Sequence, residues 1–329
     1  METRRPLSFL SLVTGSWFLV TGATGCAHLP LDAQYRGPLG LPREIAAYYT
    51  YPQTTPQATS ELLEVRSRYR RLLVRFPLTT PDVEPTEPVV EFEWFEVTRP
   101  GRHPAILFSP ILGGDYPLER GICRFFAAHG FHVALVHRKT LKVSPEKDAK
   151  YLELLLRQAI LRNRQILDWV ASHPQVDSTR LGGFGISMGG IANFMTAAVD
   201  PRLRCHVVAL AGGSLADILR DSHDKLIAKP RAKYLAAHRL DPATMHAILA
   251  EQLKTDPLRL APYVDSRQLL MVIALIDRTI GTPNALRLWK AAGRPEAVLI
   301  PLGHYTTYLV LPYLKYASLR FFQTHLLTP

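Results

Sequence analysis

The stretch LGGFGISMGG, residues 181–190, decides the fold prediction. Its central part, Gly-Ile-Ser-Met-Gly at 185–189, matches a very tight strand-to-helix turn with a serine at the apex. Positions two residues to either side of this serine must be small, because larger side chains would collide. An apolar run at 180–184 precedes the turn and a helical pattern at 190–199 follows it, which favours this turn over a glycine-rich loop with an incidental serine. We therefore expect Ser187 to point toward a helix N-terminus, where free N–H groups stabilise developing negative charge.

The flanking sequence alternates short apolar runs with amphipathic stretches. The predicted strands cover 71–76, 89–98, 105–109, 131–137, 180–184, 206–211, 269–275 and 297–301. The predicted helices begin with a short segment near residue 60 and continue at 118–129, 151–172, 190–199, 283–292 and 307–325. This alternation is typical of an α/β chain whose mostly parallel sheet is covered by helices on both faces. Residues 214–262 form a charged, helical insertion.

The run DSTRLGGFGISMGG, residues 177–190, resembles a pattern found in one superfamily. It is similar to the D-x-x-R-hydrophobic-G…G-x-S-x-G-G pattern of dienelactone-hydrolase-like and prolyl-oligopeptidase-like α/β-hydrolases. The resemblance covers about 89–325 and specifies the superfamily better than the subfamily. It implies the α/β-hydrolase fold, with a mostly parallel, doubly wound sheet and a helical cap formed by the insertion. It also implies that Ser187 is a nucleophile that requires no metal and no organic cofactor.

In this fold the acid and the histidine follow the nucleophile in the order Ser, Asp or Glu, His. Asp277 comes directly after the predicted strand at 269–275 and is the expected acid. Asp217 and Asp221 are held in reserve, because some members of the superfamily take their acid from the preceding loop. His304 follows the last predicted core strand, at 297–301, and is the expected general base. The sequence therefore predicts a triad of Ser187, His304 and Asp277.

An oxyanion hole needs two backbone N–H groups. Met188, the residue after the nucleophile, is expected to supply one of them. The loop after the strand at 105–109 is expected to supply the other, and Pro110 cannot do so because it has no N–H. Ile111 or Leu112 is therefore the second candidate. His137 ends a strand on the same side of the predicted sheet and could line the pocket.

The N-terminus has the layout of an export signal. Arg4 and Arg5 precede an apolar stretch at 7–20 that is short for a membrane span, which needs about 20 apolar residues. Ala-Thr-Gly-Cys at 23–26 resembles a bacterial lipobox, with Ala where such signals commonly carry Leu. This resemblance implies that Cys26 is acylated and that the protein is anchored in the cell envelope, facing the periplasm from the outer membrane. An ordinary signal peptide, an uncleaved anchor and a cytosolic protein are the alternatives.

The expected domain organisation follows from these segments. Residues 1–25 are predicted to be the signal peptide, 26–57 a tether rich in Pro, Gly, Thr and Gln, and 58–329 the α/β-hydrolase domain. The cap is predicted at about 214–262 within that domain.

Charge and cysteine content narrow the remaining possibilities. The net charge is +11 with a pI of about 9.7, but the basic residues are spread widely and no nucleic-acid-binding motif is present. We therefore expect no nucleic-acid partner, and a solvated basic face or attraction to an anionic membrane surface instead. Cys123 and Cys205 lie in apolar stretches, which favours buried thiols over a disulfide. No Cys/His cluster suggests a metal.

The sequence thus favours an enzyme that cleaves carboxylic esters of small molecules or lipids through Ser187. Two alternatives belong to other classes: a non-catalytic lipoprotein that uses the fold as a binding scaffold, and a protein that binds membrane surfaces through its charge. A third alternative is an acyltransferase or lipase acting on membrane lipid. The sequence does not specify the physiological ester, the acyl-chain length or the oligomeric state.

Overall fold

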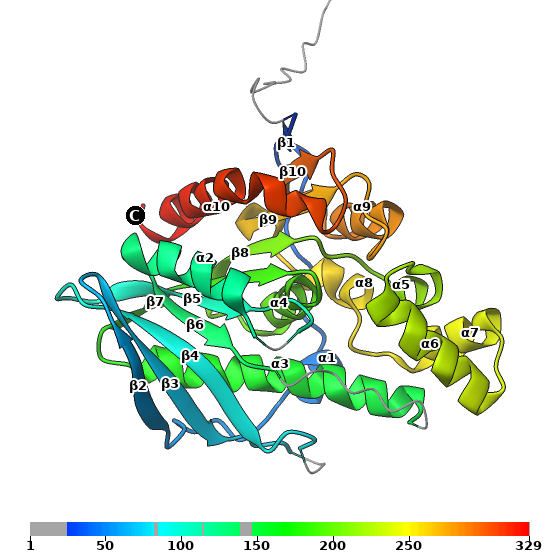
Figure 1. The fold of residues 1–329 in the computed structure, drawn as a ribbon, viewed down its shortest axis with the longest axis horizontal. Helices are drawn as coiled ribbons and strands as arrows, with labels where there is room; N and C mark the ends of the chain where they lie inside the picture. The colour runs from blue at the N-terminus through cyan, green and yellow to red at the C-terminus, as the bar shows by residue number, and fades with distance from the viewer. Residues whose placement is uncertain (1–24, 82–84, 114, 139–146, 329) are drawn as a thin grey trace, which may run out of the picture.

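A computed structural model describes residues 25–81, 85–113, 115–138 and 147–328. The predicted signal peptide lies outside these residues, except for Gly25. Ten strands form one sheet (Figure 1). In spatial order they are β1 (Ala27–Leu29), β10 (Glu296–Ile300), β9 (Leu269–Ala274), β8 (Leu203–Ala209), β7 (Val176–Ile186), β5 (His103–Ser109), β6 (His132–Val136), β4 (Val89–Val97), β3 (Tyr69–Pro77) and β2 (Thr59–Val65).

The centre of the sheet is parallel and both of its edges are antiparallel. The six strands from β10 to β6 run parallel to one another, and β1, β4, β3 and β2 join by antiparallel pairing. Strand β9 is apolar throughout and every one of its residues is buried, as are all residues of β6. Strands buried on both faces require helices on both sides, which fits the continuous apolar runs in the sequence.

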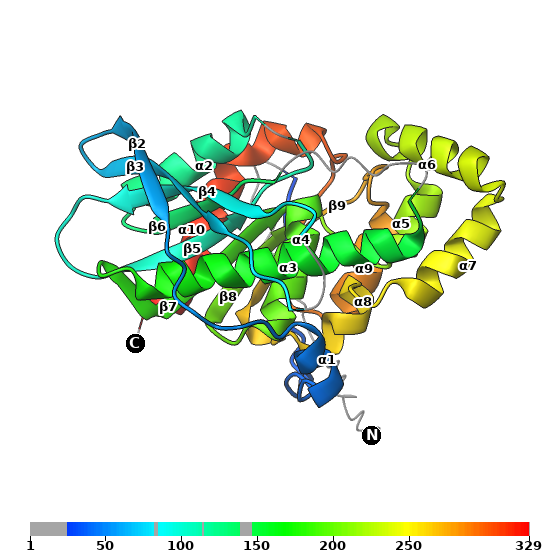
Figure 2. The same ribbon diagram turned by 90° about the horizontal axis from the view of Figure 1, so that it is seen from below.

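Helices cover both faces of the sheet. The helices α2 (Pro117–Ala128) and α10 (Leu311–Leu326) lie side by side on one face, in a cluster that includes Phe126 and Phe322 (Figures 1 and 2). The other face is covered by α3 (Ala149–Ser172), α4 (Met188–Val199) and α9 (Thr282–Ala291), in a second cluster. Cys123 and Cys205 are free thiols, both fully buried, as the sequence favours.

Four helices fill the insertion between β8 and β9. They are α5 (Leu215–Asp221), α6 (Lys225–His238), α7 (Pro242–Gln252) and α8 (Pro257–Leu260). Both views place α5, α6 and α7 together at one end of the molecule, beside the N-terminal end of α3 (Figures 1 and 2). Helix α6 buries none of its residues, so it packs loosely on the domain.

The structure differs from the sequence prediction near residue 60. A short helix is expected there, but residues 59–65 form the edge strand β2, paired with β3. Its glutamates face arginines of the neighbouring strand, with Glu64 3.2 Å from Arg71 and Glu61 3.4 Å from Arg75. Glu and Leu favour helices locally, but pairing with the sheet edge and these cross-strand ion pairs stabilise the strand instead.

The segment predicted as a tether also differs, because much of it packs on the domain. Strand β1 adds to the edge of the sheet beside β10, and α1 (Arg43–Tyr48) follows it. Tyr49 and Tyr51 are buried, and their hydroxyls donate to Thr255 at 2.9 Å and to Asp168 at 2.7 Å. Burial of two aromatic rings with satisfied hydroxyls stabilises this segment, although its composition shows no periodicity. The segment 52–57 has no helix or strand and is largely exposed.

Candidate active site

Ser187 lies at the junction of β7 and α4, in the tight turn that the sequence predicts. Its backbone has φ 56° and ψ −122°, a left-handed conformation that costs about 1–3 kcal/mol for a residue other than glycine. Its N–H donates to the carbonyl oxygen of Ala209 at 2.8 Å, which fixes the turn to β8. A Cβ at Gly185 would collide with the backbone of Gly189, and a Cβ at Gly189 with that of Ser109. Both flanking glycines are therefore required by close packing.

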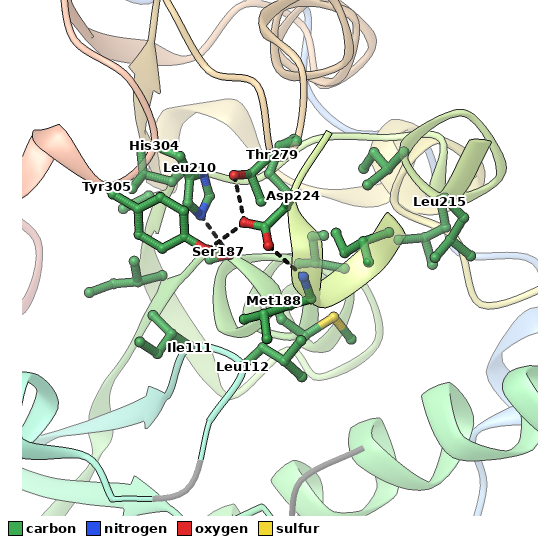
Figure 3. Close-up of a pocket in the computed structure, with 18 of the residues that line it drawn as sticks. Ile111, Leu112, Ser187, Met188, Leu210, Leu215, Asp224, Thr279, His304 and Tyr305 are labelled. Carbon is green, nitrogen blue, oxygen red and sulfur yellow. Dashed lines mark hydrogen bonds between the residues drawn. The ribbon is translucent and has the colours of Figure 1, made fainter. Parts of the chain in front are cut away.

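The structure brings His304 and Asp277 to this serine. The His304 Nε2 atom lies 3.0 Å from the Ser187 Oγ atom (Figure 3). Its Nδ1 atom lies 2.7 Å from Oδ2 of Asp277. Both partner side chains are buried, with exposures of 8% for His304 and 2% for Asp277. With Nδ1 protonated, the imidazole donates to the carboxylate and leaves Nε2 free to accept the serine proton.

The Asp277 carboxylate is held in place by its own loop. Its Oδ1 atom accepts the N–H groups of Thr279 at 2.8 Å and Ile280 at 2.9 Å, while Oδ2 faces His304. Oδ1 therefore anchors the side chain to its own loop, and Oδ2 orients the imidazole. This loop follows β9, where the sequence places the acid.

The reserve acids lie elsewhere. Asp217 accepts from His246 at 2.8 Å and from Ser214 at 3.0 Å, and it pairs with Arg287. Asp221 is exposed and pairs with Arg220. Neither carboxylate hydrogen-bonds His304 among the described residues, so both belong to the structure of the cap.

His137 is occupied by an ion-pair cluster at the sheet. Its ring nitrogens lie 2.8 Å from Glu91 and 3.1 Å from Glu93. It is not among the described residues that line the cavity beside Ser187. The pocket-lining role considered for it therefore has no support in the structure.

The candidate oxyanion donors can now be compared. Met188 is the first residue of α4, so its N–H has no partner within the helix and is free to face the cavity. The N–H of Ile111 donates to the buried carboxylate of Glu119 at 3.1 Å and is thereby occupied. The N–H of Leu112 has no hydrogen-bond acceptor among the described residues. Leu112 rather than Ile111 is therefore the candidate for the second donor.

The loop that carries Leu112 is held by two charged groups, the buried Glu119 and the half-buried Arg138. Glu119 accepts the N–H of Ile111, and the Arg138 guanidinium donates to the carbonyl oxygens of Ile111 at 2.7 Å and Pro110 at 3.2 Å. Burial lowers the pKa of Arg138. Contacts from both sides orient the backbone of this loop before any ligand arrives, which is the preorganisation that an oxyanion hole requires.

A large apolar cavity opens beside these groups. Its volume is about 980 Å³, at the upper end of the ~300–1,000 Å³ found for small-molecule sites. Figure 3 shows His304 and Tyr305 on one side of Ser187, and Ile111, Leu112 and Met188 on the other. Most of the wall is aliphatic and includes residues of the insertion such as Leu219. The insertion therefore forms part of the cavity wall.

Sequence analysis does not identify three polar residues beside His304. Asp224, which precedes α6, accepts from Thr279 at 3.0 Å and from the hydroxyl of Tyr305. Burial and the hydrogen bond to Asp224 raise the pKa of Tyr305 to about 12. Burial also opposes ionisation of Asp224, but the hydrogen bonds that it accepts, first that from Tyr305, hold its pKa below the usual value. This cluster joins the insertion to the loops of the acid and the histidine. Tyr305 adjoins His304 in sequence, but no spacing pattern links it to Asp224.

Two searches of the described residues gave no further site. No group of three or more His, Cys, Asp or Glu side chains within the described ranges is arranged to hold a metal ion. No helix within those ranges has the length and apolar character needed to cross a membrane.

The strand order and the turn at Ser187 define the α/β-hydrolase fold, as the sequence predicts, and solved structures share it. Acetyl xylan esterase 1 from Thermoanaerobacterium sp. JW/SL YS485 is 18% identical with a TM-score of 0.61, covering 88% of this chain and 99% of its own. An acetyl xylan esterase from Paenibacillus sp. R4 is 18% identical with a TM-score of 0.64, covering 86% and 93%. The Pyrococcus furiosus esterase Pf2001 is 12% identical with a TM-score of 0.51, covering 88% and 98%.

Comparison of sequences adds little to this. No family model matches the chain. Two uncharacterised proteins of Mycobacterium tuberculosis, from strains CDC 1551 and H37Rv, are each 25% identical over 150 residues, or 45% of this chain. The chain spans about a third of the length of these curated relatives, 33% in each case.

Proposed function

We propose that this protein is a serine hydrolase that cleaves carboxylic esters through an acyl-enzyme on Ser187. The observation that carries the proposal is the continuous relay from the Ser187 hydroxyl through His304 to Asp277, with distances of 3.0 Å and 2.7 Å. The strained backbone of Ser187 costs free energy. A purely structural role for Ser187 would require neither that strain nor a histidine and a carboxylate linked to it in series. The solved structures with a similar fold are named as esterases, which favours the same class of reaction.

The proposed reaction has two halves. The Ser187 oxygen attacks the ester carbonyl carbon while its proton passes to His304 Nε2, and Asp277 stabilises the resulting imidazolium. The N–H groups of Met188 and Leu112 hold the negatively charged oxygen of the tetrahedral intermediate. When the intermediate collapses, the C–O bond to the alcohol breaks and His304 returns the proton to the departing alcohol. Water then attacks the acyl-enzyme by the same route, releasing the acid and free Ser187.

A fluorophosphonate probe tests this proposal and separates it from the scaffold alternative. Wild-type protein should be labelled on Ser187 and should hydrolyse a panel of p-nitrophenyl esters, whereas Ser187→Ala should do neither. Ser60→Ala, which removes an exposed hydroxyl on the edge strand, is the matched control and should behave as wild type. A folded wild-type protein that neither reacts with the probe nor cleaves any ester in the panel would leave the fold as a binding scaffold.

We further propose that the chain is exported and anchored through an acylated Cys26, with the enzyme facing the periplasm from the outer membrane. In the unacylated chain Cys26 is 2% exposed and directly precedes β1. Acylation must therefore precede the pairing of β1 with β10 or displace it. Radiolabelled fatty acid should enter wild-type protein expressed in bacteria and should not enter Cys26→Ser. Equal labelling of Cys26→Ser would refute the anchor.

A further inference from the structure

Helix α6 carries three lysines along one face. Lys225, Lys229 and Lys233 are spaced four residues apart, so they lie one above another at about 6 Å intervals. We call them the lysine stripe. All three are exposed at the surface and all three line the cavity that contains Ser187. Helix α6 contains no acidic residue, and none of the ion pairs among the described residues involves the stripe.

The other cations of the cavity wall have protein partners. Arg231 donates to the carbonyl oxygens of Leu219 at 3.0 Å and Arg220 at 2.6 Å, which closes the end of α5. Lys315 lies over the Phe125 ring and Lys147 over the Tyr151 ring, 5.0 Å and 5.3 Å from the ring centres. The lysine stripe differs in having no side-chain hydrogen bond, ion pair or ring contact with any described residue, so its ammonium groups are available to a ligand.

The carboxylates of the wall do not neutralise the stripe either. Among the described lining residues they are Asp148 and Asp224. Asp148 accepts the N–H of Tyr151 at 3.0 Å and caps α3. Asp224 accepts from Thr279, Tyr305 and the N–H of Leu226. A helix face whose lysines served only for solvation would have no reason to line the cavity. All three lysines of the stripe line it.

The cavity thus joins an apolar wall to a row of free positive charges. Such a wall suits an acyl chain, and lysine ammonium groups bind phosphate as point charges. We propose that the substrates are long-chain acyl esters whose alcohol part carries a phosphate, which the lysine stripe binds while the acyl chain occupies the cavity. This inference rests on the proposed function and specifies its substrate class. It makes the three lysines determinants of specificity rather than catalytic residues.

A pair of esters with one acyl chain tests this inference. The probes are 1-decanoylglycerol and 1-decanoylglycerol 3-phosphate, both at concentrations where they are monomeric, with decanoic acid release as the measurement. We expect wild-type protein to show the higher kcat/KM for the phosphate ester. The triple variant Lys225→Gln, Lys229→Gln, Lys233→Gln should lower the ratio of the two kcat/KM values by about tenfold, mainly through KM for the phosphate ester. Added salt should lower the wild-type ratio, because it screens exposed charges.

A matched variant controls for net charge. Lys150→Gln, Lys254→Gln, Lys290→Gln removes three exposed lysines that do not line the cavity, and it should leave the ratio unchanged. Gln and Lys have similar helix propensities, and Lys254 lies outside the helices, so both triple variants should fold, which circular dichroism checks. An equal fall in both variants, or no preference in wild type, would overturn the inference.

A second experiment distinguishes recognition of the phosphate on a single substrate molecule from attraction to a charged lipid surface. Both esters are presented in phosphatidylcholine vesicles and, separately, as monomers. A preference for the phosphate ester among monomers supports the inference. A preference confined to vesicles would overturn it, because surface charge rather than the substrate's own phosphate would then be recognised. If wild type cleaves neither ester and no panel ester either, the proposed function itself fails.

Discussion

Two regions of the cavity are built in opposite ways. One is its floor, where the residues of the predicted triad lie, and the other is the part of the wall that the insertion forms. On the floor, Ser187, His304 and Asp277 follow the ends of three neighbouring or near-neighbouring parallel strands, and hydrogen bonds fix each side chain. In the insertion, α6 buries none of its residues and presents the lysine stripe and the exposed Leu226. Under the proposed function, this difference assigns the chemistry to loops fixed by the sheet and the choice of substrate to a segment that packing constrains little. The predictions below test that division, starting with the largest effect.

The acid offers the sharpest contrast between the two regions, since Asp277 and Asp217 follow successive strands. Asp277→Asn should keep the fold but lower kcat by ~10⁴, because the amide cannot hold the imidazole in the required tautomer. Asp217→Asn, in the insertion, should change kcat little. Steady-state kinetics on a p-nitrophenyl ester measures both. Near-normal kcat of Asp277→Asn, together with a large loss of kcat in Asp217→Asn, would show that the catalytic acid lies in the insertion. That result would contradict the division between the two regions.

The cluster of Asp224, Thr279 and Tyr305 is a point where the two regions meet. We expect Asp224→Asn to lower kcat about tenfold, because the charged hydrogen bonds that position the histidine loop weaken. The Asp224 carboxylate also attracts the positive charge of His304, so its loss should move the acidic limb of the pH–kcat/KM profile to lower pH. Tyr305→Phe removes one of the same hydrogen bonds but keeps the carboxylate. Its profile should stay in place, and equal shifts in both variants would assign Asp224 a purely structural role.

The floor could be predicted from the sequence because its information is local. The turn at 185–189 is readable from glycine spacing, and the fold dictates the chain order in which Asp277 and His304 follow. Each of them ends an apolar run, so the strand pattern alone indicates its position. The same reasoning left the second oxyanion donor open, since only the structure shows that the Ile111 N–H donates to Glu119.

The rest depends on contacts between distant parts of the chain. The hydrogen bond from Tyr305 to Asp224 joins residues that no spacing relates. Strand β1 and the burial of Tyr49 depend on partners more than 200 positions away, such as Thr255. Strand β2 has local helix formers, and only pairing with β3 makes it a strand. The lysine stripe is visible as a periodic pattern, but its place beside the cavity is not.

The central claim is that Ser187 and His304 act as one catalytic unit, and a double-mutant cycle tests it most directly. Ser187→Ala and His304→Ala should each lower kcat for ester hydrolysis by at least ~10⁴, and the double variant should be hardly worse than either single variant. Once one partner is gone, the other has nothing to activate or be activated by. The measurement is kcat of the three variants on one p-nitrophenyl ester, with circular dichroism to verify folding. Additive losses, or substantial activity in either single variant, would contradict the account.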